Sequence, residues 1–532
     1  MGDPAGLSSW LRRPVGRRTT LVVALLACLA PAYLFADPLR NTWIRGDDWE
    51  YVASSRTFDR ALANLFRPHN VHVVPVWRLV SWGVVASAGR LVDVRPALAA
   101  AAYAVLATTM MLAGRFVARE TRRPLIGIAA MIALGSTALM YPAGTWFSAS
   151  QALGAAIGVL AMLWYLHGWR RSGGAWRLVL AALAALVAGG SWTAGYVAGP
   201  VGTAYLLAGR RRGGLAVAAI PLLVSAVAAA TIFITCRPAI EEQSAISFHG
   251  RKTSEAVRPH LAPLYTIQAI PERLLLGELG LVTAATFEQS AAIMAAIGVA
   301  WLATRRSAPS PLEAAGASLT VGSYLILWTF RTYLPFSSLR GQLPWYDAIP
   351  TVGAVLFASG WWAGLLPPAP PGTAVPIRRS GVVGLVALQA MLLVLHVPRM
   401  NDLFVEDVQF LLRGMTDDER KHFPIPELKR QWAVYLASAY VVRQDVLFRR
   451  LETAERIARS AGIGRRTLRA LYGRRIWPNP PVIDDADLLA LPDDGPTTDP
   501  ATVRALLGPP FAIEPEPKPF WIPPYVPWPP RP

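Results

Sequence analysis

The chain has 532 residues, of which 53% are hydrophobic and 16% charged, with a formal net charge of +18 and a mean hydropathy of +0.35. A soluble domain usually carries about 25% charged residues, so this composition excludes an ordinary soluble protein and indicates a polytopic membrane protein. The arginines stand in short clusters between apolar runs, which is typical of cytoplasmic loops and argues against nucleic-acid binding. The two cysteines, Cys28 and Cys236, form no C-x-x-C pair and predict no disulfide framework.

Apolar runs that could become membrane helices recur along the first 396 residues. A spanning helix needs about 20 mostly apolar residues. We predict such helices at 19–36, 94–114, 124–141, 150–167, 178–190, 194–209, 215–235, 279–303, 312–330, 347–366 and 381–396. The first run is interpreted as a retained signal-anchor, because no A-x-A cleavage site follows it. The predicted fold class is therefore an all-α polytopic membrane protein with about 11 transmembrane helices and a long first outer loop.

Clusters of arginine assign the loops to alternating sides of the membrane. Four arginines precede the first apolar run, at positions 12, 13, 17 and 18, so we predict a cytoplasmic N-terminus. Later clusters fall at every second loop, at 115–124, 168–177, 210–212, 305–306 and 378–379. This alternation puts the C-terminal region outside. If the short runs at 178–190 and 194–209 form one kinked helix instead, the side of everything after them reverses.

The apolar segment 73–89, VVPVWRLVSWGVVASAG, does not fit this alternation as a span. Counting it as one would put the arginines of 115–124 outside and invert every later cluster. We therefore predict a helix that lies along the membrane surface. Trp77 and Trp82 would then sit at headgroup level, and Arg78 would extend its charged end to water.

Polar residues collect in the loops that this topology puts outside the cell. The long outer loops are 37–93, 236–278 and 331–346. We predict a transmembrane domain at 1–396, with 37–93 as its functional loop. Residues 397–509 combine helical spacing with mixed charge, which predicts an extracytoplasmic helical region. Residues 510–532 are a Pro-rich tail that we expect to be extended.

The stretch NTWIRGDDWE places two adjacent carboxylates, Asp47 and Asp48, soon after the first apolar run. One interpretation is an ordinary helix start, because Asp47 and Glu50 have the spacing of a capping box. The other is an active site in the outer loop. Both interpretations are open from these residues alone.

Downstream in the same loop, FRPHNVHVVP contains Arg67, His69 and His72. The two histidines are either solvated loop residues, part of a helix start, or part of a substrate site. Together, GDDW and HNVHVVP resemble the first outer loop of the GT-C superfamily of membrane glycosyltransferases, in the branch that uses polyprenyl-phosphate sugars. The usual His-Pro-Pro of that branch is absent, and HVVP stands in its place at 72–75.

The resemblance covers the topology of 1–396 and implies a reaction. A sugar would pass from a polyprenyl-phosphate donor to a cell-envelope glycan, lipid or protein, with inversion at the anomeric carbon. Asp48 matches the position of the general base that takes the proton of the acceptor hydroxyl. Asp47 would orient Asp48, and the two carboxylates could also hold a divalent metal. No other cofactor is expected.

The lipid phosphate that leaves in this reaction needs cationic or hydrogen-bonding partners. Arginine suits phosphate because its donors form a fixed fork. The candidates in the outer loops are Arg67, His69, His72, Arg258, His260, Arg331, Tyr333, Arg340 and Tyr346. The alternative for each is an interface anchor or a solvated loop side chain.

Two other functions remain open. A transporter or flippase of a lipid-linked glycan would use the same membrane region, although the spans contain few ionisable residues for transport. A non-catalytic envelope assembly protein would use the C-terminal tail to recruit a partner. Under each of these hypotheses the chain resides in a bacterial plasma membrane and binds no nucleic acid.

Overall fold

A computed structural model provides the fold of this chain. It describes residues 9, 11–40, 48–69, 72–209, 214–247, 259–278, 286–304, 308–331, 344–369 and 374–413. The predicted C-terminal helical region and Pro-rich tail lie beyond these residues, apart from 397–413. Helices dominate the described part of the chain, which contains no β-strand, as the all-α prediction requires.

Long helices occupy the positions of the predicted apolar runs. They are α2 (Arg17–Leu34), α7 (Leu91–Thr121), α8 (Pro124–Gly135), α10 (Gln151–Ser172), α11 (Ala175–Ser191), α12 (Ala198–Ala208), α13 (Gly214–Ser247), α17 (Phe287–Thr304), α18 (Pro311–Arg331), α19 (Ala348–Leu365) and α20 (Arg379–Arg413). Short α-helices connect them: α3 (Ala36–Arg40), α4 (Asp48–Ser54), α5 (Phe58–Ala63), α6 (Pro75–Ala88), α9 (Tyr141–Thr145), α15 (Ala262–Ala269) and α16 (Leu276–Glu278). Short 3₁₀-helices are η1 (Ala138–Met140), η2 (Thr193–Val197), η3 (Pro259–Leu261) and η6 (Pro344–Asp347), and η4 (Ile270–Leu275) is a π-helix.

The described residues support fewer membrane spans than the predicted 11. Six helices are long and apolar enough to cross a membrane: Asp93–Thr121, Gln151–Ser172, Gly214–Ile240, Phe287–Thr304, Ala348–Leu365 and Arg379–Val405. A seventh is added if α8 and the segment Ala138–Thr145, bent by 62°, form one broken span. The runs at 178–190 and 194–209 became α11 and α12, whose 17 and 11 residues fall short of the about 20 that a span needs. The chain is a multi-pass, all-α membrane protein.

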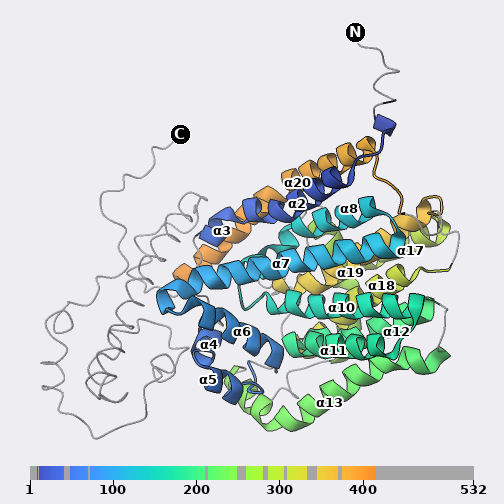
Figure 1. Ribbon diagram of the computed structural model, residues 1–532. Helices are drawn as coiled ribbons and strands as arrows, with labels where there is room; N and C mark the ends of the chain where they lie inside the picture. The colour runs from blue at the N-terminus through green and yellow to red at the C-terminus, as the bar shows by residue number, and fades with distance from the viewer. Residues whose placement is uncertain are drawn as a thin grey trace, which may run out of the picture. The chain divides into compact units, whose positions relative to one another are not determined.

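The chain divides into two compact units. Figure 1 labels the helices of both. Unit 1 contains residues 1–35, 65–77 and 102–400, and unit 2 contains 36–64, 78–101 and 401–532.

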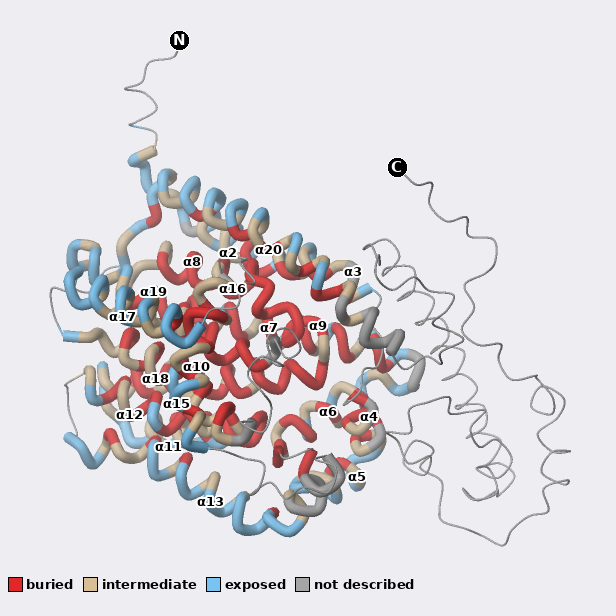
Figure 2. Tube along the Cα trace, turned by 180° about the vertical axis from the view of Figure 1, so that it is seen from behind, coloured by how far each residue is buried: buried red, intermediate tan, exposed pale blue. Residues whose placement is uncertain are grey.

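The distribution of exposed and buried side chains over the helices of unit 1 fits a membrane environment. In Figure 2 the exposed colour runs along α13 and the buried colour fills α10. Only 17% of the span in α13 is buried, against 78% in α10. The exposed side chains of α13 are large and apolar, including Leu223, Val227 and Ile234. Apolar surface of this kind is unfavourable in water and is matched by hydrocarbon.

Close helix packing in unit 1 depends on small residues. A Cβ added to Gly158 of α10 would lie 2.6 Å from the backbone nitrogen of Ala188 in α11. A Cβ on Gly316 of α18 would lie 2.3 Å from the backbone nitrogen of Phe357 in α19. Because lipid supplies no hydrophobic force between helices, the van der Waals contacts made at such close approach help to hold these helices together.

The segment predicted as a surface helix forms α6, which has 14 residues. At 1.5 Å per residue it is about 21 Å long, too short for the about 30 Å of hydrocarbon. It is therefore a helix but not a span, as predicted. The expectation for two of its side chains is wrong, because Trp77 and Arg78 are 1% and 0% exposed. Arg78 does not extend to water, and the reason is the ion pair described below.

Candidate functional site

The acidic stretch of the first outer loop begins a helix in unit 2. Helix α4 starts at Asp48, and its first turn contains Asp48 and Glu50, where carboxylates stabilise the positive end of the helix. A helix does start at this stretch, while the capping box of Asp47 and Glu50 stays a prediction. Asp48 is nevertheless only 3% exposed, which is unusual for a carboxylate that serves solely as a helix start in water. Asp47 lies outside the described residues.

An ion pair inside unit 2 holds α4 against α6. The Nη2 atom of Arg78 lies 2.8 Å from Oε1 of Glu50, and its Nη1 donates to Oγ of Ser54 at 3.0 Å. The guanidinium also lies over the ring of Tyr51, 5.7 Å from its centroid. Glu50, Ser54 and Tyr51 all belong to α4, so one buried arginine fixes the orientation of this helix. The sequence shows each residue but gives no reason to pair them.

The two predicted histidines belong to unit 1 and are buried. His69 and His72 exchange backbone hydrogen bonds of 2.7 and 2.9 Å. Nδ1 of His72 lies 3.0 Å from Oγ1 of Thr193, and its ring meets the edge of Trp192 at a centroid distance of 6.2 Å. The alternative of solvated loop histidines is therefore wrong, because His69 is 3% and His72 8% exposed. Arg67, in contrast, is exposed.

Tyr346, a predicted substrate residue, is part of the same group of side chains in unit 1. Its ring stacks on Trp192 with centroids 5.9 Å apart and planes only 4° from parallel. Tyr346 is 7% exposed and Trp192 is 2% exposed. His72, Trp192 and Tyr346 thus form a continuous aromatic contact between three segments that are distant in sequence.

The residue after Tyr346 anchors a buried ion pair that the sequence did not reveal. Asp347 receives two hydrogen bonds from Nε of Arg273, at 2.8 and 3.0 Å, and one from Nη2 at 2.8 Å. The hydroxyl of Tyr324 donates to the same carboxylate at 2.7 Å. Burial alone would lower the pKa of Arg273, but the charge and hydrogen bonds of Asp347 raise that pKa above its usual value. This arrangement joins η4, α18 and the start of α19.

The remaining candidate phosphate ligands stay predictions. Arg331 ends α18, and its side chain is not described. Arg258, Tyr333 and Arg340 lie outside the described residues. His260, in η3, is exposed.

A metal site also stays a prediction. Within the described ranges, no three His, Cys, Asp or Glu side chains gather closely enough to hold a metal ion. Because Asp47 is not among the residues described, the predicted pair with Asp48 is not tested.

Comparison with known proteins found similarity to a solved structure. No protein-family model and no curated protein matches the chain. The chain is similar to the archaeal oligosaccharyltransferase AglB from Archaeoglobus fulgidus, solved in complex with an inhibitory peptide and a dolichol-phosphate. The TM-score is 0.39 at 13% identity, and the match covers 77% of this chain and 59% of that one. The chain thus spans less than two thirds of the length of the structure it matches.

Proposed function

We propose that this protein is an integral membrane glycosyltransferase with Asp48 as its general base. It transfers a sugar from a polyprenyl-phosphate donor to a hydroxyl of an envelope glycan, lipid or protein at the extracytoplasmic face. The observation that supports the proposal is the burial of Asp48 at the start of a helix that Arg78 holds in place. A carboxylate held in one orientation can meet an acceptor hydroxyl without a further cost in ordering.

The proposed step is a single displacement. Asp48 takes the proton of the acceptor hydroxyl, and the acceptor oxygen forms a bond to the anomeric carbon of the sugar. The bond from that carbon to the phosphate oxygen breaks at the same time, and polyprenyl phosphate leaves with the electron pair. Its negative charge requires cations nearby. Arg67, Arg258, Arg331 and Arg340 are the candidates that the sequence provides.

The proposal is tested by replacing the two acidic residues separately. Asp48→Asn keeps the size of the side chain and its ability to start a helix, but it cannot accept the proton. We expect transfer from a radiolabelled polyprenyl-phosphate sugar, measured in membranes, to fall about 100-fold or more. In cells the lipid-linked sugar should accumulate. Asp47→Asn should cost less, because we assign Asp47 only an orienting role.

The matched control is Asp59→Asn, which changes an exposed carboxylate in the first turn of α5, in the same loop. It should leave transfer unchanged at equal membrane abundance. If Asp48→Asn and Asp47→Asn both behave like the parent, α4 is only a helix start. The transporter and assembly hypotheses would then replace the glycosyltransferase.

A further inference from the structure

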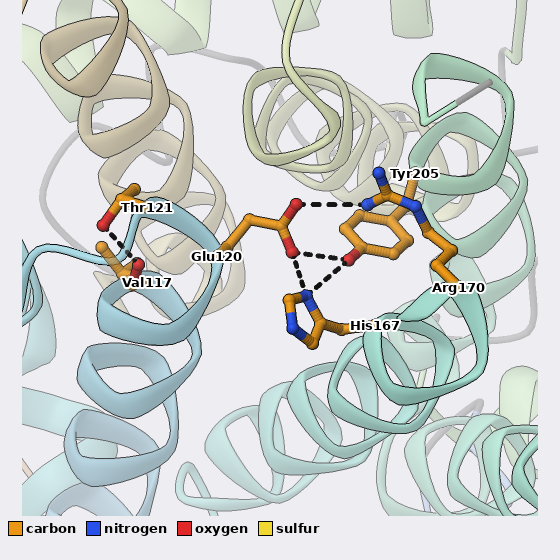
Figure 3. A network of polar contacts seen from close by, with 6 residues as sticks. All are labelled: Val117, Glu120, Thr121, His167, Arg170 and Tyr205. Carbon is orange, nitrogen blue, oxygen red and sulfur yellow. Dashed lines mark hydrogen bonds and ion pairs between the residues drawn. The ribbon is translucent and has the colours of Figure 1, made fainter. Parts of the chain in front are cut away.

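The arginine-rich ends of α7 and α10 in unit 1 contain a buried polar network (Figure 3). Glu120 of α7 is the centre of this network. Its Oε1 accepts from Nη1 of Arg170 at 3.1 Å, and its Oε2 accepts from the hydroxyl of Tyr205 at 2.7 Å and contacts Nδ1 of His167. The side chain of Glu120 is 12% exposed. Both carboxylate oxygens of Glu120 therefore contact side chains of α10 and α12.

The arginines beside Glu120 on α7 form no ion pair with it, because its oxygens contact His167, Arg170 and Tyr205. Arg115 and Arg119, one turn apart on α7, lie over the ring of Trp164 in α10, with centroid distances of 5.7 and 4.3 Å. In the described part of the chain neither arginine makes a hydrogen bond or an ion pair. Besides partial burial, the positive charges of Arg171 and Arg177 disfavour the charge of Arg119, and the carboxylate of Glu120 favours it. Four guanidinium groups therefore gather where the nearest acid is already occupied.

One of these four has a structural role at the end of α10. Nη1 of Arg177 donates to the carbonyl oxygen of Gly173 at 2.6 Å, which satisfies a free carbonyl at the helix C-terminus. Its guanidinium also lies 4.7 Å from the ring centroid of Trp176, a side chain that is 56% exposed. Arg115 and Arg171 are exposed, and Arg119 is half-buried. The guanidinium N–H donors of these three arginines are therefore available to a ligand.

The position of the group along the helices identifies the kind of ligand. Both α7 and α10 are apolar enough to cross a membrane, and their apolar spans end at Thr121 and Ser172. The arginines and tryptophans therefore fall at the boundary between hydrocarbon and water, where lipid headgroups lie. A guanidinium held over an indole ring keeps its planar fork of donors, and phosphate oxygens match that geometry. Anionic phospholipids are the phosphates available at this depth.

We propose that Arg115, Arg119 and Arg171, beside Trp164, bind the phosphate headgroup of an anionic phospholipid. The site is independent of the proposed glycosyl transfer and uses none of its residues. Bound lipid relieves the repulsion among the arginines and holds the ends of α7 and α10 together from outside, as Glu120 does from inside.

The test is the lipid selectivity of the purified full-length protein in nanodiscs that contain phosphatidylglycerol and phosphatidylcholine. Native mass spectrometry measures which lipid is retained when the disc is removed. We expect the parent to retain phosphatidylglycerol preferentially. Arg115→Gln with Arg119→Gln should weaken retention by about fivefold for each charge removed. Arg90→Gln, at an exposed position near the opposite end of α7, is the control and should retain lipid like the parent.

Three results would overturn the proposal: equal retention of both lipids by the parent, unchanged retention in the double variant, or an equal loss in the control. Displacement of the lipid by an equal concentration of inorganic phosphate would also overturn it, because the ligand would then be a free anion. If the double variant does not fold, Arg171→Gln serves instead. That exposed side chain donates no hydrogen bond within the described residues, and its loss should weaken retention about fivefold.

Discussion

At the scale of single residues, we expect the stability of the fold to depend strongly on the buried carboxylate of Asp347. It is 2% exposed, and Arg273 and Tyr324 satisfy it. Removal of one partner of a buried ion pair leaves the other charge uncompensated, at a cost of about 3–5 kcal/mol. We expect this loss for Asp347→Asn and for Arg273→Gln, measured by thermal unfolding in detergent.

Tyr324→Phe removes one hydrogen bond to the same carboxylate and leaves the ion pair intact. Its expected cost is about 1.5–3 kcal/mol, below that of either charge removal. Glu288→Gln, an exposed change in the first turn of α17, should have little effect. A Tyr324→Phe variant less stable than Arg273→Gln would contradict the assignment of the ion pair as the main contact.

Arg78 allows a residue-scale prediction in unit 2. Its planar fork reaches Glu50 and Ser54 together, and a lysine has no such fork. Arg78→Lys should therefore keep the charge but lower glycosyl transfer in the assay used for Asp48, because α4 is no longer held in one orientation. The same activity in Arg78→Lys and the parent, at equal abundance, would show that this support is unnecessary.

At the scale of elements, the contact between α18 and α19 depends on the absence of side chains. A Cβ on Gly353 of α19 would lie 2.5 Å from Oγ1 and 2.6 Å from the backbone nitrogen of Thr320 in α18. Gly353→Ala should destabilise the protein by about 1–3 kcal/mol, because the backbone of α18 must move. Gly364→Ala, in the same helix, has open space around the added Cβ and should be neutral or slightly stabilising. Equal melting temperatures for the two variants would contradict this packing.

At the scale of the whole molecule, the arginine clusters predict which side of the membrane each loop faces. Ala175 and His260 are both exposed, and the predicted topology puts the first in the cytoplasm and the second outside. In intact cells a membrane-impermeant thiol reagent should label His260→Cys at once. It should label Ala175→Cys only after permeabilisation. The parent is the control, because Cys28 and Cys236 are buried. The reverse labelling pattern would invert the topology and put the lipid site on the opposite face.

The sequence by itself determined that the chain is helical, that it belongs in a membrane and where its long helices lie. The physical reason is local: within hydrocarbon each backbone group must bond inside its own segment, so a long apolar run specifies a helix from its composition. For this reason α7, α10, α13 and α20 cover predicted runs, although α13 continues beyond 235 to Ser247 and α20 beyond 396 to Arg413. The count of 11 was wrong for the described residues, since helix length depends on where packing breaks a run.

Only the tertiary structure decided which polar residues meet. Arg273 and Asp347 are 74 positions apart, and Glu120 and His167 are 47 apart. No periodicity relates residues at such distances, because their contact follows from how several helices pack. The burial of His72 and of Arg78 was missed for the same reason. The sequence of one segment shows whether a side chain prefers water. It does not show which residues from other segments surround that side chain once it is buried.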